Sequence, residues 1–178
     1  MGEGGERLLG WYSAGETEYG LPGSEVAFRV SPQTADLLRQ TSTTTGALLT
    51  GRRTFDLTHG WGGGHPLGVP VFVLTHTVPQ EWAYEGSPFT FVTGGLESAL
   101  EQAKSVAGEK DVGVIGASLV QQCLRAGLLD DIHVDHVPVL LGDGVKLFDH
   151  LGTGPIELEI TRMIEGTGVT HIQFRIAK

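Results

Sequence analysis

Two turns in this sequence combine residue types that bind anions. Residues 48–54 (LLTGRRT) place two guanidinium groups and a hydroxyl directly after an apolar run, and residues 112–120 (VGVIGASLV) lead a second apolar run into a helical pattern through Gly116. Free N–H groups at a helix start hold phosphate well, and Arg adds paired charge-assisted hydrogen bonds. Each turn alone also has a structural explanation, as a Gly that packs a helix on a strand or as two solvated arginines. Together they favour a phosphate-bearing ligand.

A third strand end extends this pattern. Leu74, Thr75 and His76 close the apolar run of residues 69–74. If all three turns follow parallel strands, they open on one edge of the sheet, where an extended dinucleotide would contact each of them. The chain has no GxGxxG motif, so the usual Rossmann arrangement is not expected.

The other polar candidates predict weaker sites. Asp135 and His136 are adjacent in an expected strand and therefore point to opposite faces. His59 and His65 flank the Trp61 loop without the spacing of a metal site, so no metal is predicted. Trp61 would either stack on a flat heterocyclic substrate or plug its own loop. No residue is evident as the catalytic acid.

Composition excludes several classes of protein. A chain of 178 residues suits a single domain over 1–178, with an irregular N-terminal segment over 1–25. The net charge of −9 argues against nucleic acid as a partner. Cys123 is the single cysteine and lies on an apolar helix face, which indicates a core residue and not a nucleophile. No apolar run is long enough to span a membrane, and no signal-peptide core is present, so a cytoplasmic protein without a membrane partner is predicted.

The hydrophobic pattern predicts alternating strands and helices. A helix should begin at Ser31-Pro32 and end at Gly46, another should cover 96–107, and Ser118 should cap the helix after Gly116, with Gln121 completing a capping box. Strands are expected over residues 26–30, 47–50, 69–74, 89–93, 112–115 and 132–141.

Two further strands, over 156–161 and 170–176, should form a C-terminal hairpin with its turn at 165–168. The whole pattern favours a mostly parallel mixed sheet, covered on both faces, with an antiparallel edge.

Four motifs show a family resemblance. They are LLTGRRTFD (48–56), GWGGGHPLGVPVFVLTH (60–76), VIGASLVQQCLRAGLLDDI (114–132) and PVLLGDGVKLFD (138–149). The chain resembles the dihydrofolate reductase family, in the branch similar to the reductase domain of bacterial riboflavin biosynthesis proteins. The resemblance covers most of the chain from about residue 26, and it implies a three-layer α/β/α sandwich that binds NADPH.

The resemblance also implies roles for single residues. Arg52 matches the position at the adenosine 2′-phosphate, and Arg53 and Thr54 match positions at the pyrophosphate. The other implied cofactor-binding residues belong to the same turns or to the end of the strand before Gly94: Thr50, Gly51, Leu74, Thr75, His76, Gly94, Ile115, Gly116, Ala117, Ser118, Leu119 and Val120.

The sequence departs from the family pattern in three places. The first strand, which in this branch lies at the centre of the sheet beside the nicotinamide, is not evident in the opening MGEGGERLLGWY. The glycine pair of the pyrophosphate turn is Gly116-Ala117, which has less backbone freedom. The pair Asp135-His136 stands where less charge is expected.

Two functions follow from these observations. The first is an NADPH-dependent reductase that transfers hydride to a small pterin- or ribosylaminopyrimidine-like substrate. The second is a non-catalytic nucleotide-binding or scaffold protein on the same fold. A homodimer is also expected, because the C-terminal hairpin has one apolar face and a sheet without its central strand needs cover.

Overall fold

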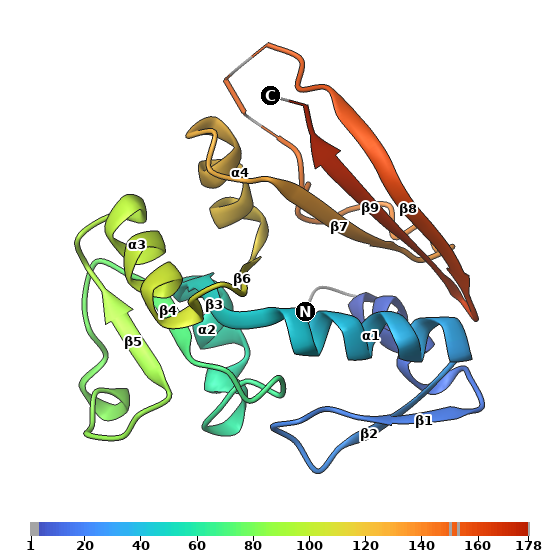
Figure 1. Cartoon of the computed structure of the whole chain (residues 1–178), viewed down its shortest axis with the longest axis horizontal. Coiled ribbons are helices and arrows are strands. Elements are labelled where there is room, and N and C mark those ends of the chain that lie inside the picture. The colour runs from blue at the N-terminus through green and yellow to red at the C-terminus, as the bar shows by residue number, and fades with distance from the viewer. Residues whose placement is uncertain (1–3, 150, 153, 178) are drawn as a thin grey trace.

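The computed structural model describes residues 4–149, 151–152 and 154–177 of the chain (Figure 1). Its helices are α1 (Pro32–Thr44), α2 (Arg52–Leu57), α3 (Leu96–Ala107) and α4 (Ala117–Arg125), with 3-10 helices at Gly5–Ser13, His59–Gly62 and Gln80–Trp82. Its strands are β1 (Thr17–Gly20), β2 (Ala27–Val30), β3 (Thr45–Gly51), β4 (Val71–Leu74), β5 (Phe89–Val92), β6 (Asp111–Ile115), β7 (Asp131–His136), β8 (Leu158–Gly166) and β9 (Val169–Ile176).

A parallel four-stranded sheet forms one half of the molecule. Its strand order is β5-β4-β3-β6, and all three pairings are parallel. Alternate residues of β3 point to opposite faces: Leu49 packs with α3 and α4, and Leu48 packs with Phe55 of α2. The expected layering of helix, sheet and helix is confirmed here.

Two helices form for the reasons that the sequence suggested. The hydroxyl of Ser31 accepts a hydrogen bond from the N–H of Thr34 at 3.2 Å, and Pro32 occupies the first turn of α1. Helix α3 buries the five apolar residues that recur at helical spacing: Leu96, Ala99, Leu100, Ala103 and Ala107. Cys123 is fully buried in the same core, as expected.

Two predicted helix boundaries and one predicted capping contact are wrong. Helix α4 starts at Ala117 with Gly116 as its N-cap, so Ser118 lies inside the helix and makes no capping hydrogen bond. Gln121 instead donates from Nε2 to the carbonyl of Lys146 at 2.9 Å. Gly46 lies inside β3, where a Cβ would come within 2.9 Å of Ala107, so close packing of α3 explains the glycine and helix termination does not.

The described part of the N-terminal segment is more regular than expected. Residues 17–20 form β1, which pairs antiparallel with β2 from Thr17 opposite Val30 onward. This hairpin buries Tyr19 in a small core with Trp11 and Val30. A four-residue strand with one buried side chain leaves too short an alternation to be recognised in the sequence. Residues 1–3 of the predicted segment lie outside the described residues.

The C-terminal strands form a separate antiparallel sheet of order β7-β9-β8. The predicted hairpin of β8 and β9 is confirmed, although β8 runs on to Gly166 and the turn is shorter than expected. Strand β7 ends at His136, so Pro138 follows the strand and does not lie within it. Proline cannot donate to a strand ladder, which agrees with this earlier end.

The expected continuous sheet is divided between β6 and β7. Among the described residues β6 pairs with β3 alone and β7 with β9 alone. The two strands stand apart in Figure 1, and a groove of about 330 Å³ lies between them, lined by residues 111–114, residues 130–133 and the end of α1. The two sheets are therefore joined by helices and loops and not by strand pairing.

A buried polar cluster ties α1 to the antiparallel sheet. The ring of His171, only 3% exposed, places Nδ1 2.7 Å from the carboxylate of Asp135 and Nε2 2.9 Å from the hydroxyl of Thr34. The hydroxyl of Ser31 donates to that of Thr34 at 2.9 Å. A neutral imidazole has one donor and one acceptor, which satisfies the carboxylate and the hydroxyl together.

Replacing His171 by Leu is expected to lower the free energy of unfolding by about 1–3 kcal/mol, because the buried hydroxyl of Thr34 loses its acceptor. Urea denaturation followed by far-UV circular dichroism measures this loss. Asp135→Asn keeps an acceptor for Nδ1 and should cost less than His171→Leu. Equal losses in the two variants would contradict the role given to Thr34.

Candidate functional site

The three turns predicted to bind phosphate lie at one edge of the parallel sheet. In the strand register Gly51 lies opposite Leu74, and Thr50 lies opposite Ile115. Since β3, β4 and β6 are parallel, the turns that follow them open on the same edge, as expected. Strand β5 ends at this edge too, just before Gly94.

The turns after β3 and β6 touch each other. A Cβ on Gly116 would lie 2.6 Å from Oγ1 of Thr54, and the φ of Gly116 is +102°, which L side chains rarely adopt. At the ends of the paired strands β3 and β6, the hydroxyl of Thr50 donates to the carbonyl of Ile115 at 3.3 Å. Gly116 thus packs directly against the hydroxyl of Thr54, which brings α2 next to the first N–H groups of α4.

The two arginines of the first turn have different environments. Arg52 donates from Nε to the carboxylate of Asp56 at 2.7 Å and from Nη1 to the carbonyl of Thr77 at 3.1 Å. Arg53 is exposed, and within the part of the chain that the structure describes it has no hydrogen bond or ion pair. The guanidinium of Arg52 is therefore already oriented, and the guanidinium of Arg53 is available to a ligand.

The third turn is held by a small hydrogen-bonded ring. The hydroxyl of Thr75, a buried residue, donates to the carbonyl of Thr77 at 2.9 Å and accepts from the N–H of Thr77 at 3.3 Å. His76 is exposed at this edge. The carbonyl of Thr77 thus receives hydrogen bonds from two turns, which links the end of β4 to Arg52.

The remaining predicted cofactor residues divide by exposure. Ser118 is exposed, and Ala117 and Val120 are half-buried near the start of α4. The side chains of Leu119 and Thr50 are almost fully buried, so these two residues can meet a ligand only through their backbone. Gly94 is exposed and lies against Ser98 of α3.

Trp61 lies in a loop with unusual backbone geometry. The φ angles of His59, Gly60 and Trp61 are all close to +50°. The indole of Trp61 is half-buried and packs edge-on to Phe55, with ring centroids 6.5 Å apart. Two roles were expected for Trp61. These contacts support the role in which the indole packs within its own loop, and stacking on a substrate stays a prediction.

His65 packs edge-on to the same indole, at 4.8 Å between ring centroids, and its Nδ1 accepts the N–H of Leu67 at 3.2 Å. Burial lowers the pKa of His65 to about 4 from its ordinary 6.5. The protonated form is therefore disfavoured in the folded chain.

Folding stability should consequently fall as the pH drops from 6.5 toward 4, because the unfolded chain binds a proton at His65 that the folded chain rejects. Partial exposure reduces the effect, so a loss of about 1–2 kcal/mol is expected from this residue. His65→Asn keeps an acceptor for Leu67 and should flatten the dependence in urea titrations at pH 4.5 and 7.5. An unchanged pH dependence of the unfolding free energy in His65→Asn would contradict the lowered pKa assigned to His65.

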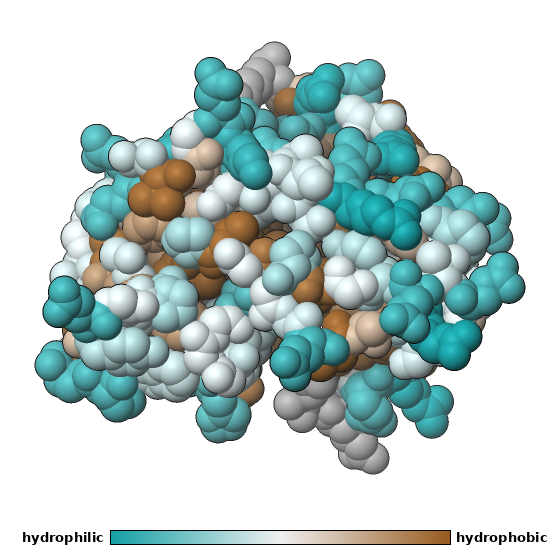
Figure 2. All heavy atoms as spheres, turned by 60° about the horizontal axis from the view of Figure 1, so that its bottom comes forward, coloured by the Kyte–Doolittle hydropathy of each residue, from teal (hydrophilic) through white to brown (hydrophobic). Residues whose placement is uncertain are grey.

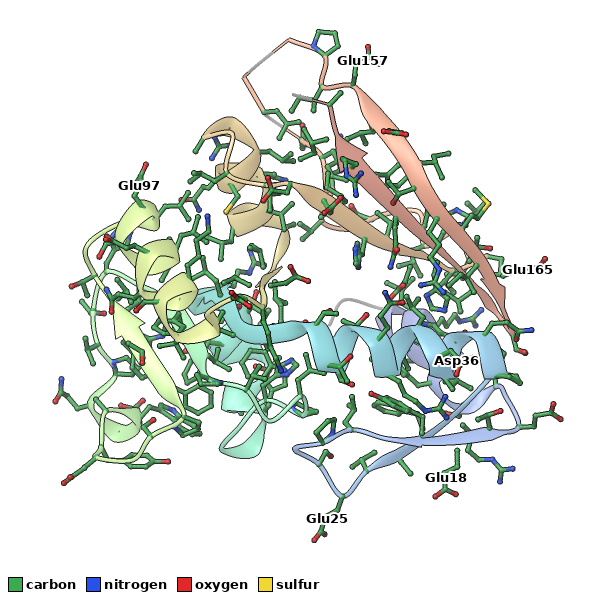
Figure 3. All side chains as sticks on the ribbon, in the orientation of Figure 1. Glu18, Glu25, Asp36, Glu97, Glu157 and Glu165 are labelled. Carbon is green, nitrogen blue, oxygen red and sulfur yellow. The ribbon has the colours of Figure 1, made fainter. Side chains whose placement is uncertain are left out.

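The negative charge of the chain is spread over the surface. Glutamates on separate elements point into solvent in Figure 3, among them Glu18 on β1, Glu97 on α3 and Glu165 on β8. On the face shown in Figure 2, hydrophobic atoms form separate patches among hydrophilic side chains. The adjacent Arg52 and Arg53 are therefore a local cationic feature in a protein of net charge −9.

The described residues contain no group of three or more His, Cys, Asp or Glu side chains placed to hold a metal ion. Nor do they include a helix with the length and apolar character that crossing a membrane requires.

Sequence reasoning missed the residues that orient Arg52. Asp56 lies four positions after Arg52, a spacing at which ion pairs form on helices, so this contact had a detectable signal. The carbonyl of Thr77 had none, since a backbone acceptor twenty-five positions away is set by the tertiary fold.

Comparison with known proteins agrees with this architecture. The sequence model of a family described as the RibD C-terminal domain matches residues 29–171. A crystal structure of a "putative riboflavin biosynthesis protein" from Shewanella sp. PV-4 is similar, with a TM-score of 0.65 and 25% sequence identity over 79% of this chain and 78% of that one.

RibD of Acinetobacter baumannii, in its form 2, has the same fold, with a TM-score of 0.55 and 12% identity over 90% of this chain. The match covers 54% of the RibD chain, so this chain spans about half its length. No curated protein matches the sequence.

Proposed function

Because the chain belongs to the RibD C-terminal domain family, we propose that it is an NADPH-dependent reductase of a small heterocyclic substrate, of the pterin or ribosylaminopyrimidine class. The observation that carries the proposal is the contact between the turns at Thr54 and Gly116, beside two arginines on the carboxyl edge of the sheet. This arrangement is suited to a ligand with several phosphate groups.

The residues at this edge fit the cofactor. The exposed guanidinium of Arg53, the hydroxyl of Thr54 and the N–H groups at the start of α4 would hold the pyrophosphate. Arg52 would hold the adenosine 2′-phosphate with the N–H groups that Asp56 and Thr77 leave free. When bound, the nicotinamide supplies the hydride, and the protein supplies orientation.

Ligand-induced stabilisation tests the proposal. A ligand at one hundred times its Kd stabilises the folded state by about 2.7 kcal/mol, which for a chain of this size raises Tm by about 5–10 °C. NADPH should produce such a shift, and NADPH absorbance should fall when pterins or ribosylaminopyrimidines are added. No shift with millimolar NADPH would reject the proposal.

A second candidate function is nucleotide binding without catalysis. It is favoured by the division between β6 and β7, since the family resemblance places a strand beside the nicotinamide at the centre of the sheet. NADPH binding without turnover of any substrate in the panel would support this candidate over the reductase.

We also propose that the chain forms a homodimer through the antiparallel sheet. Register places Ile160 opposite Phe174 and Met163 opposite Ile172, which gives one apolar face, and Ile160 and Met163 are 56% and 59% exposed. Sedimentation at micromolar concentration should show a species twice the mass of the 18.9 kDa chain, and Ile160→Glu should dissociate it. A parent protein that sediments only as a monomer would exclude the dimer.

A further inference from the structure

We propose that Asp56 is a positioning residue that fixes the guanidinium of Arg52 and thereby sets the preference for NADPH over NADH. This inference rests on the proposed function of the site. It assigns to Asp56 a role in cofactor selection, exerted through Arg52 and not through direct contact with the cofactor.

The first step is the geometry of the guanidinium. Asp56 accepts from Nε at 2.7 Å, and the carbonyl of Thr77 accepts from Nη1 at 3.1 Å, so two groups on different elements hold Arg52. A guanidinium has five N–H groups, and the three that remain are all on the terminal Nη atoms. The end of the Arg52 side chain can therefore form a bidentate pair of hydrogen bonds with a phosphate.

The second step is that the ion pair between Arg52 and Asp56 contributes little to the free energy of folding. The side chains of Arg52 and Asp56 are 34% and 53% exposed. Exposed ion pairs of this kind contribute about 0–1 kcal/mol to folding. The main effect of the pair is that Arg52 keeps one orientation before a ligand arrives, which lowers the entropy loss on binding.

The third step is the charge of Asp56 itself. Its carboxylate reduces the local positive potential, and this would weaken a phosphate contact if orientation did not matter. Asp56→Asn separates the two effects, since the amide oxygen still accepts from Nε but carries no charge. Asp56→Ala removes both the charge and the acceptor.

Calorimetric titration of the parent and the variants with NADPH, NADH and 2′,5′-ADP tests the inference. Asp56→Ala should weaken NADPH and 2′,5′-ADP by about threefold to tenfold and leave NADH unchanged. Asp56→Asn should bind NADPH and 2′,5′-ADP, the two ligands with a 2′-phosphate, at least as well as the parent does. In the Arg52→Ala background, Asp56→Ala should have no further effect, because there is no guanidinium to position.

Asp36→Ala is the matched control. Asp36 pairs with Arg39 at 2.6 Å on the exposed face of α1, and Figure 3 labels it away from the three turns, so its loss should change no ligand affinity. Equal strengthening of NADPH binding by Asp56→Ala and Asp56→Asn would overturn the inference, as would an Asp56→Ala effect that persists without Arg52. Failure of the parent to bind NADPH would instead overturn the proposed function, and this inference with it.

Discussion

Replacing Arg52 by Ala is expected to weaken NADPH binding by about ten- to a hundredfold and to leave NADH binding nearly unchanged. NADPH differs from NADH by one 2′-phosphate, which a protein of net charge −9 repels unless a local cation compensates. A charge-assisted pair of this kind contributes about 1.5–3 kcal/mol, which corresponds to the stated range in affinity. Titration of both cofactors by calorimetry or tryptophan fluorescence measures the two dissociation constants.

Arg53 provides the comparison for this prediction. Its exposed guanidinium is assigned to the pyrophosphate, which both cofactors carry, so Arg53→Ala should weaken NADPH and NADH alike. If Arg52→Ala weakens both cofactors equally, the roles assigned within the turn are wrong.

Replacing Gly116 by Ala is expected to reduce the binding of both cofactors more than tenfold and to destabilise the fold by about 2–4 kcal/mol. The new Cβ would lie 2.6 Å from Oγ1 of Thr54, and the backbone at φ +102° would have to carry a side chain. The methyl group would also displace the hydroxyl of Thr54, which is assigned to the pyrophosphate. Urea denaturation and cofactor titration of the purified variant measure the two effects.

Gly127→Ala separates backbone strain from the clash. Gly127 has a φ of +66°, and a Cβ there would meet nothing within 4 Å. This variant should lose about 1 kcal/mol of stability and bind cofactor as the parent does. A Gly116→Ala protein that behaves like Gly127→Ala would show that the contact with Thr54 has no part in binding.

Local signals predicted those elements of the fold that local physics determines. Helix α1 begins where Ser31 can cap it, and α3 follows the spacing of its five buried apolar residues. The predicted N-cap at Ser118 is wrong because a serine near the start of a helix has the same sequence signature as an N-cap. The positive φ of Gly116 allows Gly116 to be the N-cap, so the helix begins at Ala117. Strand β1 was missed because its one buried side chain, Tyr19, is covered by residues distant in sequence.

The candidate site was predictable to a similar extent. Parallel strands that end in three phosphate-competent turns place those turns at one common edge, and the sequence pattern predicts this arrangement. The orientation of Arg52 was not predictable, because it depends on the loop after β4 folding back to present the carbonyl of Thr77. The burial of Leu119, in contrast, has a local signal, because Leu119 lies on the same apolar helix face as Cys123.

The division between β6 and β7 also bears on the cooperativity of unfolding. Strand pairing does not link the two sheets within the described residues, so the antiparallel sheet can open while the parallel sheet remains folded. Amide hydrogens of β8 and β9 should then exchange with solvent deuterium through a lower-energy opening than those of β3, which is central in its sheet. Ligands that bind the three turns would slow exchange in β3, β4 and β6 most, and the antiparallel sheet would keep its own, faster opening rate.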